Sequence, residues 1–323
     1  MRQAFAPLLL ASASLPQLYC SHHSHPGAGL PRDMELNSTT PLAPARDAAT
    51  VILLRDAPQG LEVFLVKRHG LSDVLGGAYV FPGGKLDTED SMLDSDLHLD
   101  QTAAALHAKL AEPGIAPATA MGLFVAAVRE AFEESGILFV QDAGRVQAFL
   151  PGAAEQSFNT MLTTHSLRLQ TQSLVPWSRW ITPRMPSVSS KRFDTRFFVA
   201  EVPQDQIAKH DDVETTASTW IRPRAALEQY WAGQIEMAPP QIMTLAHLSH
   251  FRHVRDVMVQ AHGQHPPVIF PETFEAGGER VICYPGDPHH PVTERAMPGP
   301  TRVLYRNRRF EPEAGFEALF EGS

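Results

Sequence analysis

The sequence predicts an α/β protein in which a mixed sheet lies between helices. Two aliphatic and β-branched runs, residues 48–55 and 61–68, flank the turn residue Gly60 and predict a pair of neighbouring strands. A long stretch from residue 117 to residue 135 predicts a helix with one apolar face, and further strands and helices follow it. This order of strands, helix, strands and helix indicates helices packed on a sheet.

The composition limits the possible functions. The 323 residues are 43% hydrophobic and 20% charged, which suffices for one large domain or two small ones. The net charge of −9 argues against a nucleic-acid partner, because such proteins carry a basic surface, although a local basic cleft could still bind a small anion. No apolar run approaches the ~20 residues that span a bilayer. Cys20 and Cys283 alone do not make a disulfide framework and fit a reducing compartment.

The two ends of the chain differ from its middle. Residues 1–45 mix Pro, Ser, Ala and His without a period, which predicts a disordered tail or a translation start placed too early, with Met34 as the alternative start. Residues 46–261 are predicted to form one domain. Residues 262–323 are rich in Pro and Gly, and two short strands, 280–284 and 301–305, predict an extension packed on that domain.

Local signals define the other elements. Pro117 suits the first position of the long helix, and Gly136 suits its left-handed end. His247, His250 and His253 recur every three residues on the last predicted helix. A zinc site there lacks a further carboxylate or Cys at the required spacing, so a polar stripe is favoured. The remaining predicted strands are 78–81, 137–140, 177–182, 192–200 and 220–221, and the remaining helices are 101–111, 223–233 and 239–261.

Three glutamates lie near the end of the long helix. Glu130, Glu133 and Glu134 share one helix face, and Arg129 precedes them. Like charges at this spacing repel by ~0.2–0.5 kcal/mol per exposed pair. The cluster is therefore either a solvated acidic face or the binding site of a cation, and Mg²⁺ prefers such carboxylate oxygens.

A glycine-rich loop precedes this helix at residues 81–87, and its two glycines allow the backbone to come close to other groups. Loop and helix together resemble the Nudix box, G-x5-E-x7-R-E-U-x-E-E-x-G-U, where U is aliphatic. The match starts at Gly84 and places Asp90 where the family has Glu. Residues 91–128 number 38 where the family has seven, so 31 residues, about 91–121, are inserted and are partly helical. The second half of the box matches at Arg129, Glu130, Ala131, Glu133, Glu134, Gly136 and Ile137.

The resemblance implies a Nudix α/β/α sandwich and a hydrolase of nucleoside diphosphate derivatives that needs Mg²⁺ or Mn²⁺. It implies that Arg129 orients the glutamates. Asp90 could fill the role of the box Glu or be a solvated loop acid. Glu214, which precedes Trp220, could be a further base or ligand, or a surface acid. The metal ligands implied by the resemblance are Glu130, Glu133, Glu134 and the backbone carbonyl of Gly84.

An interrupted box of this kind resembles the coenzyme A and acyl-coenzyme A diphosphatases. Their second signature, L-L-T-x-R-[S/A]-x3-R-x3-G-x3-F-P-G-G, matches at Arg68, at Gly77 and from Phe81 to Gly84, whereas Asp73 replaces its second Arg. Arg192 could face the cleft or make a structural contact with Asp194. The candidate substrate-binding residues are Arg68, Lys67, Gly83, Gly84, Lys85 and Arg192.

Two other functions fit the same sequence. One is a pyrophosphatase for ADP-ribose, NADH or dinucleoside polyphosphates, since base and sugar contacts lie in variable loops. The other is a non-catalytic Nudix module that binds a nucleotide and regulates a partner, although all three glutamates are present. We expect a small-molecule nucleotide as the partner, no nucleic acid or membrane, and a possible homodimer. The ending Glu321-Gly322-Ser323 differs from a Ser-Lys-Leu signal, so we expect a cytoplasmic location.

Overall fold

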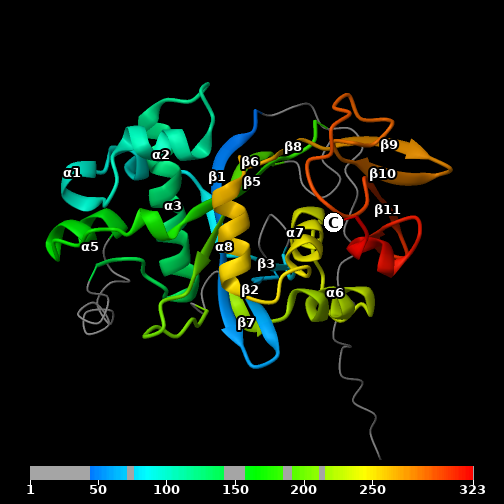
Figure 1. Cartoon of the computed structure of the whole chain (residues 1–323), viewed down its shortest axis with the longest axis horizontal. Helices are drawn as coiled ribbons and strands as arrows, with labels where there is room; N and C mark the ends of the chain where they lie inside the picture. Colours follow the sequence, from blue (N-terminus) through cyan, green and yellow to red (C-terminus); the bar gives the residue numbers. More distant parts are fainter. Residues whose placement is uncertain (1–43, 71–75, 142–156, 185–190, 211–214, 323) are drawn as a thin grey trace, which may run out of the picture. The chain divides into compact units, whose positions relative to one another are not determined.

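The computed structural model describes residues 44–70, 76–141, 157–184, 191–210 and 215–322. The predicted tail up to residue 43 and the candidate Glu214 lie outside the described residues. Figure 1 shows the fold, and its main sheet has eight strands. These are β1 (Arg46–Ala57), β2 (Gly60–Arg68), β3 (Tyr79–Val80), β4 (Gly83–Lys85), β5 (Val175–Ile181), β6 (Phe193–Glu201), β7 (Thr215–Ile221) and β8 (Val268–Ile269).

The main sheet is mixed, as predicted. Its order is β3-β2-β1-β6-β5-β8, with β1 antiparallel to β2 and parallel to β6. The first half of β1 also pairs with β4, so residues 83–85, predicted as a loop, form a short strand. Gly83 permits this close pairing, because a Cβ there would lie 2.5 Å from the Thr50 hydroxyl oxygen.

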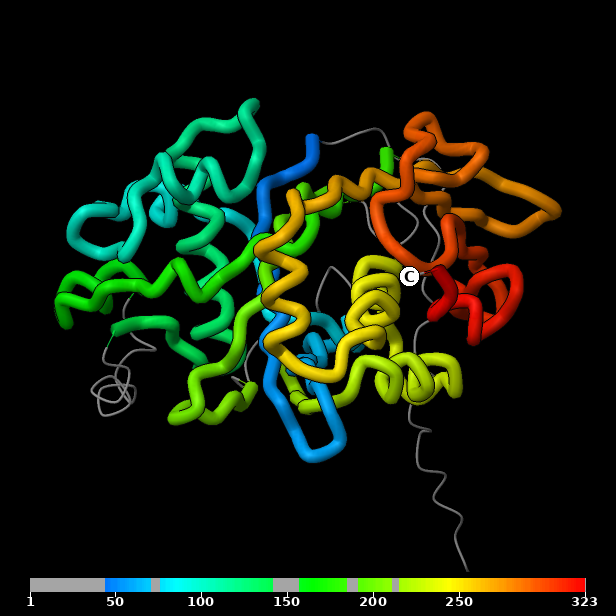
Figure 2. Tube along the Cα trace, viewed as in Figure 1, coloured from blue at the N-terminus to red at the C-terminus, as the bar shows by residue number. Residues whose placement is uncertain are grey.

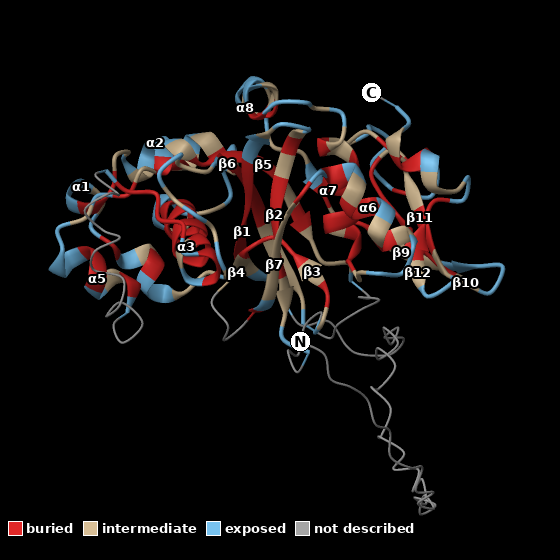
Figure 3. Ribbon diagram, turned by 90° about the horizontal axis from the view of Figure 1, so that it is seen from below, coloured by how far each residue is buried: buried red, intermediate tan, exposed pale blue. Residues whose placement is uncertain are grey.

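Helices cover both faces of the sheet (Figures 1 and 3). Val51 and Leu53 of β1 pack in the cluster that contains α3, whereas Ile52 and Leu54 pack in the cluster that contains α6, α7 and α8. This alternation along one strand confirms the predicted α/β class with a sheet between helices. The helices are α1 (Ser95–His98), α2 (Ala103–Leu110), α3 (Pro117–Ser135), α5 (Phe158–Thr164), α6 (Pro223–Trp231), α7 (Pro239–Leu248) and α8 (Val254–Gly263).

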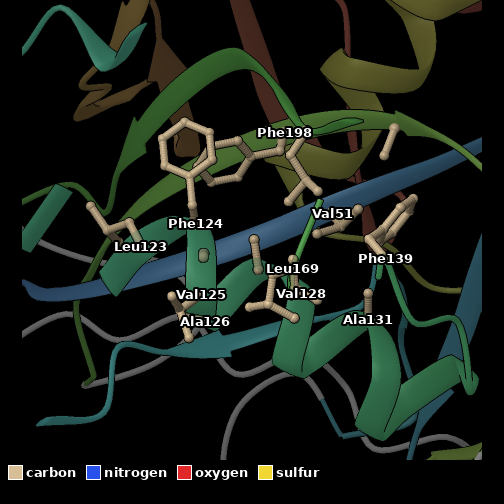
Figure 4. Packing of buried hydrophobic residues seen from close by; sticks show 14 of the residues in the cluster. Val51, Leu123, Phe124, Val125, Ala126, Val128, Ala131, Phe139, Leu169 and Phe198 are labelled. Atoms are coloured by element: carbon tan, nitrogen blue, oxygen red, sulfur yellow. The ribbon is translucent and has the colours of Figure 1, made fainter. Parts of the chain in front are cut away.

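Helix α3 is buried along most of its length (Figure 3). Its apolar residues pack against the strands of the sheet, and the rings of Phe124 and Phe198 lie 4.8 Å apart (Figure 4). The helix begins at Pro117 and ends at Gly136, whose φ of 70° is left-handed, as the sequence predicts. Rigid packing of this helix fixes the position of the glutamates at its end.

The segment inserted in the box is anchored to the sheet. Its predicted helix is confirmed as α2, and the loop after α2 carries the buried carboxylate of Glu112. Arg196 of β6 donates two hydrogen bonds of 3.0 and 2.6 Å to Glu112, and Arg179 of β5 forms an ion pair of 3.0 Å with it. In Figure 2 this segment is the cyan-to-teal part of the tube on the left. The insert is therefore held against β5 and β6 through Glu112.

Residues 137–140 do not form the predicted strand. The side-chain amide of Gln206 bonds to both the N–H and the C=O of Leu138, at 2.8 and 2.9 Å. Val140 makes only an isolated bridge to Leu169. A side chain thus replaces the strand partner that this segment would need.

The single helix predicted at 239–261 is wrong, because the chain forms α7 and α8 with a break between them. The carboxylate of Asp56 accepts a hydrogen bond of 2.9 Å from the backbone N–H of Val254 and so caps α8. His253 is the N-cap residue of α8, whereas His247 lies on α7. The three histidines therefore do not form one stripe.

His247 is expected to make stability depend on pH. Its ring lies 4.7 Å from that of Trp177 in a tilted arrangement, and burial, aided by the charge of His250, lowers its pKa to about 4. Between pH 6.5 and 4 the unfolded chain binds a proton that the folded chain does not, so the free energy of unfolding falls as pH falls. This loss is at most about 3 kcal/mol. Urea unfolding of the wild type and His247→Gln across this range should show a shallower dependence for the variant. The same pH dependence of the free energy of unfolding in both proteins would show that His247 is not responsible for it.

The C-terminal residues form a second sheet. Its antiparallel order is β12-β11-β10-β9, which confirms both predicted strands and adds two. Ile282, Val303 and Phe310 join the core cluster that contains Ile242 and Met243 of α7. None of the described helices is long and apolar enough to cross a membrane. The strands are β9 (Glu272–Ala276), β10 (Glu279–Cys283), β11 (Arg302–Arg306) and β12 (Arg309–Glu311).

Candidate active site

Arg129 is the centre of a polar network at the end of α3. Its guanidinium donates two hydrogen bonds of 3.0 Å to Asp90, and one each to Glu130 (2.7 Å) and Glu133 (3.0 Å). A further bond of 3.0 Å reaches the carbonyl of Lys85 in the glycine-rich segment. Burial acts to lower the pKa of Arg129, but the bond to Asp90 and the charges of Glu130 and Asp90 raise it overall. Arg129 therefore stays charged and can hold two glutamates in place.

Asp90 is not a solvated loop acid. Only 1% of this residue is exposed, and its carboxylate also accepts a hydrogen bond of 2.9 Å from the N–H of Asp87. It lies in the 3₁₀ turn Thr88–Met92, which packs on α3 at Gly122, where a Cβ would lie 2.3 Å from the hydroxyl oxygen of Ser91. The first half of the box thus contacts the second half through Asp90 and Arg129, despite the insert between them.

The two glycines of the glycine-rich segment, Gly83 and Gly84, contact the glutamates. The N–H of Gly83 donates a hydrogen bond of 3.1 Å to Glu134, of which only 3% is exposed. A Cβ on Gly84 would lie 2.3 Å from a carboxylate oxygen of Glu130. These positions need glycine because the backbone itself approaches the carboxylates.

Gly84→Ala is expected to lower kcat/KM by about 10²-fold or more, because the new methyl group must displace the carboxylate of Glu130. Steady-state kinetics of the purified variant would measure this. Gly114→Ala is the matched control, since a Cβ there meets no atom within 4 Å. If Gly84→Ala and Gly114→Ala were equally active, Glu130 would not need its present position.

A cleft of about 1020 Å³ opens beside this network. Glu130 and Glu133 line it, whereas Glu134, which accepts the hydrogen bond from Gly83, is not among its described lining residues. Basic and acidic side chains share its wall, so an anion and a cation could be bound together. Further described residues that line it are Arg46, Ala48, Thr50, Arg68, Val80, Gly83, Gly84, Lys85, Asp87, Thr88, Glu89, Asp90, Arg129, Ser157, Phe158, Asn159, Lys191, Phe193, Thr195 and Gln241.

The predicted substrate-binding residues divide into two groups. Arg68, Gly83, Gly84 and Lys85 line the cleft, and the buried Nε of Arg68 has no hydrogen-bond partner. Lys67 and Arg192 are not among its described lining residues.

The hydrogen bonds of Arg192 differ from the structural contact with Asp194 that the sequence left open. Arg192 donates to the carbonyls of Thr182 and Pro183, both at 3.1 Å, whereas the carboxylate of Asp194 accepts two hydrogen bonds from Arg179. The chain neighbours of Arg192 face the cleft instead. No local motif marks three further lining residues, Arg46, Lys191 and Gln241, so they could not be predicted from the sequence.

The oxygen donors at this site suit a hard divalent cation. The side chains of Glu130, Glu133 and Glu134 supply carboxylates, and the backbone of Gly84 lies close to the carboxylate of Glu130. Among the described residues, no three acidic, His or Cys side chains already converge on one point. Arg129 bonds to Glu130 and Glu133, so a cation would compete with its guanidinium for these oxygens.

Comparisons with known proteins identify the family. A family model described as the NUDT19 Nudix domain matches residues 45–248. The putative nudix hydrolase 7 of Caenorhabditis elegans is 25% identical over 271 residues, which cover 81% of this chain and 80% of that protein. The acyl-coenzyme A diphosphatase NUDT19 of Xenopus laevis is 27% identical over 234 residues, which cover 61% of this chain and 62% of that protein.

A solved structure supports the same assignment. The crystal structure of a NUDIX hydrolase from Alicyclobacillus acidocaldarius has a TM-score of 0.54 and 26% sequence identity to this chain. The match covers 67% of this chain and 96% of that one, which confirms the predicted Nudix fold. This chain is therefore a Nudix hydrolase and belongs to the family of the NUDT19 Nudix domain.

Proposed function

We propose that this chain hydrolyses the diphosphate linkage of coenzyme A or acyl-coenzyme A. The products would be 3′,5′-ADP and 4′-phosphopantetheine or its acyl form. The observation that carries the proposal is the pair of hydrogen bonds from Arg129 to Asp90. They join the two halves of the Nudix box, which the insert separates in the sequence. The interrupted box is the feature that relates the chain to this subgroup. Relatives from frog, chicken and human that bear the name acyl-coenzyme A diphosphatase support the same substrate class.

The residues of the cleft have distinct tasks in this proposal. Glu130, Glu133 and Glu134 would hold Mg²⁺ or Mn²⁺ together with the carbonyl of Gly84. The metal would offset charge on the diphosphate and lower the pKa of an attacking water. Arg129 keeps two of the glutamates oriented through its bonds of 2.7 and 3.0 Å.

The other polar residues have roles in binding the phosphate groups or in activating the attacking water. Arg68 and Lys85, at the wall of the cleft, would bind phosphate oxygens, and the unpartnered Nε of Arg68 supports this role. Glu214, outside the described residues, stays the candidate for a further base or ligand. In this proposal the substrate lies in the cleft that Arg68 and Lys85 line together with Glu130 and Glu133.

A substrate panel tests the proposal. Turnover of coenzyme A, acyl-coenzyme A, ADP-ribose, NADH and diadenosine polyphosphates is compared with Mg²⁺ and with Mn²⁺. We expect the highest kcat/KM for coenzyme A or its acyl form. Preference for ADP-ribose or NADH would be consistent with the proposed catalytic site but would contradict coenzyme A as the substrate. No turnover of any compound would favour a nucleotide-binding module without catalysis.

A further inference from the structure

Gln241 lines the cleft, and its side chain is largely buried. This residue lies in the first turn of α7, after Pro239 and Pro240, and is 7% exposed. Its side-chain oxygen is buried and has no hydrogen-bond partner. A buried amide without a partner is unfavourable, so an apolar residue would suit this wall better unless a ligand completes the hydrogen bond. Because Gln241 lines the cleft, a ligand bound there is a candidate partner for this oxygen.

The strands opposite Gln241 form the floor of this part of the cleft. Thr50 of β1 and the side chains of Phe193 and Thr195 of β6 line it. Side chains two residues apart on a strand point to the same face of the sheet. Ile52 lies two residues after Thr50, and Phe197 two after Thr195, and both pack in the cluster that contains α7, so this floor faces α7. Phe193 is only partly buried there, and its ring offers a flat apolar surface on which a planar base can stack.

Basic residues flank this surface. Arg46 is the register partner of Phe193 across the β1–β6 pair, and Lys191 lies two residues before Phe193. Both side chains line the cleft. A ring surface and two cations on the strands, opposite the carboxamide of Gln241 on α7, match a purine nucleoside that carries phosphate groups.

We propose that Gln241 determines the base specificity of the enzyme by binding the adenine of the substrate. This inference rests on the proposed function, in which the substrate contains 3′,5′-ADP. The carboxamide oxygen accepts a hydrogen bond from the 6-amino group of adenine, and the amide nitrogen can donate to a ring nitrogen of the same edge. Hypoxanthine carries an acceptor oxygen at position 6, so it presents a like group to the carboxamide oxygen.

The test compares two bases with two variants. Coenzyme A and its hypoxanthine analogue are offered to the wild type, to Gln241→Leu and to Thr244→Val. Thr244 is the matched control, because it is a buried polar residue on α7 that is not among the described lining residues of the cleft. We expect the wild type and Thr244→Val to prefer adenine by about 10-fold in KM, with similar kcat, and Gln241→Leu to lose this preference.

Two further measurements separate the possible results. Binding of 3′,5′-ADP and of its inosine analogue, followed by the rise in Tm, tests base recognition without hydrolysis. Preference for 3′,5′-ADP that depends on Gln241, in a protein that does not cleave coenzyme A, would uphold the inference and overturn the proposed function. Cleavage of coenzyme A with equal use of both bases would overturn the inference alone. The Tm of unliganded Gln241→Leu should equal or exceed that of the wild type, and a lower Tm would indicate a structural role instead.

Discussion

Glu134→Gln is expected to lower kcat by about 10³-fold or more and to leave the fold intact. The substitution removes one carboxylate charge from the proposed metal site, and a factor of 10³ corresponds to about 4 kcal/mol in the activation free energy. The fold should survive because the glutamine oxygen can still accept the hydrogen bond of 3.1 Å from Gly83. The loss should therefore appear in catalysis and not in stability.

Single-turnover kinetics at saturating Mg²⁺ measure this effect, and thermal unfolding checks the fold. Glu228→Gln is the matched control, since Glu228 is exposed on α6 and pairs only with Arg224 among the described residues. The control should retain wild-type turnover. Wild-type turnover by Glu134→Gln would remove this residue from the metal site.

Arg129→Met is expected to lower the free energy of unfolding by about 3–5 kcal/mol, the usual cost of removing one partner of a buried ion pair. The variant leaves Asp90, which is 1% exposed, without its main charged partner. Glu130 and Glu133 also lose the guanidinium that separates them. Urea unfolding gives the change in stability.

A double variant tests the cause of this loss. Arg129→Met combined with Asp90→Leu replaces both buried charges with apolar groups, so it should recover most of the lost stability. Activity should stay low in the double variant, because the glutamates lack their orienting partner. Equal stability of the single and double variants would show that the unpaired charge of Asp90 does not cause the loss of stability in Arg129→Met.

Regular elements with a clear period could be predicted from the sequence, whereas segments that depend on distant side chains could not. The strands β1 and β2 and the helix α3 carry their own hydrophobic patterns. Residues 137–140 have the composition of a strand, but Gln206 occupies the backbone groups of Leu138. The break before α8 depends on Asp56, almost 200 residues earlier in the chain.

The site divides in the same way. The spacing of Glu130, Glu133 and Glu134 on one helix face predicts their proximity without a structure. The state of Asp90 could not be predicted, because its burial depends on how the insert folds back onto α3. Gln241 carries no motif, and only the packing of α7 against the sheet brings it to the cleft.

Product analysis of coenzyme A incubated with the enzyme tests the central claim most directly. In the presence of Mg²⁺, mass spectrometry should detect 3′,5′-ADP and 4′-phosphopantetheine in equal amounts. Chelation of the metal should abolish both products, and Glu134→Gln should form them about 10³-fold more slowly. Formation of dephospho-coenzyme A and free phosphate, or equal rates with and without the metal, would contradict the account.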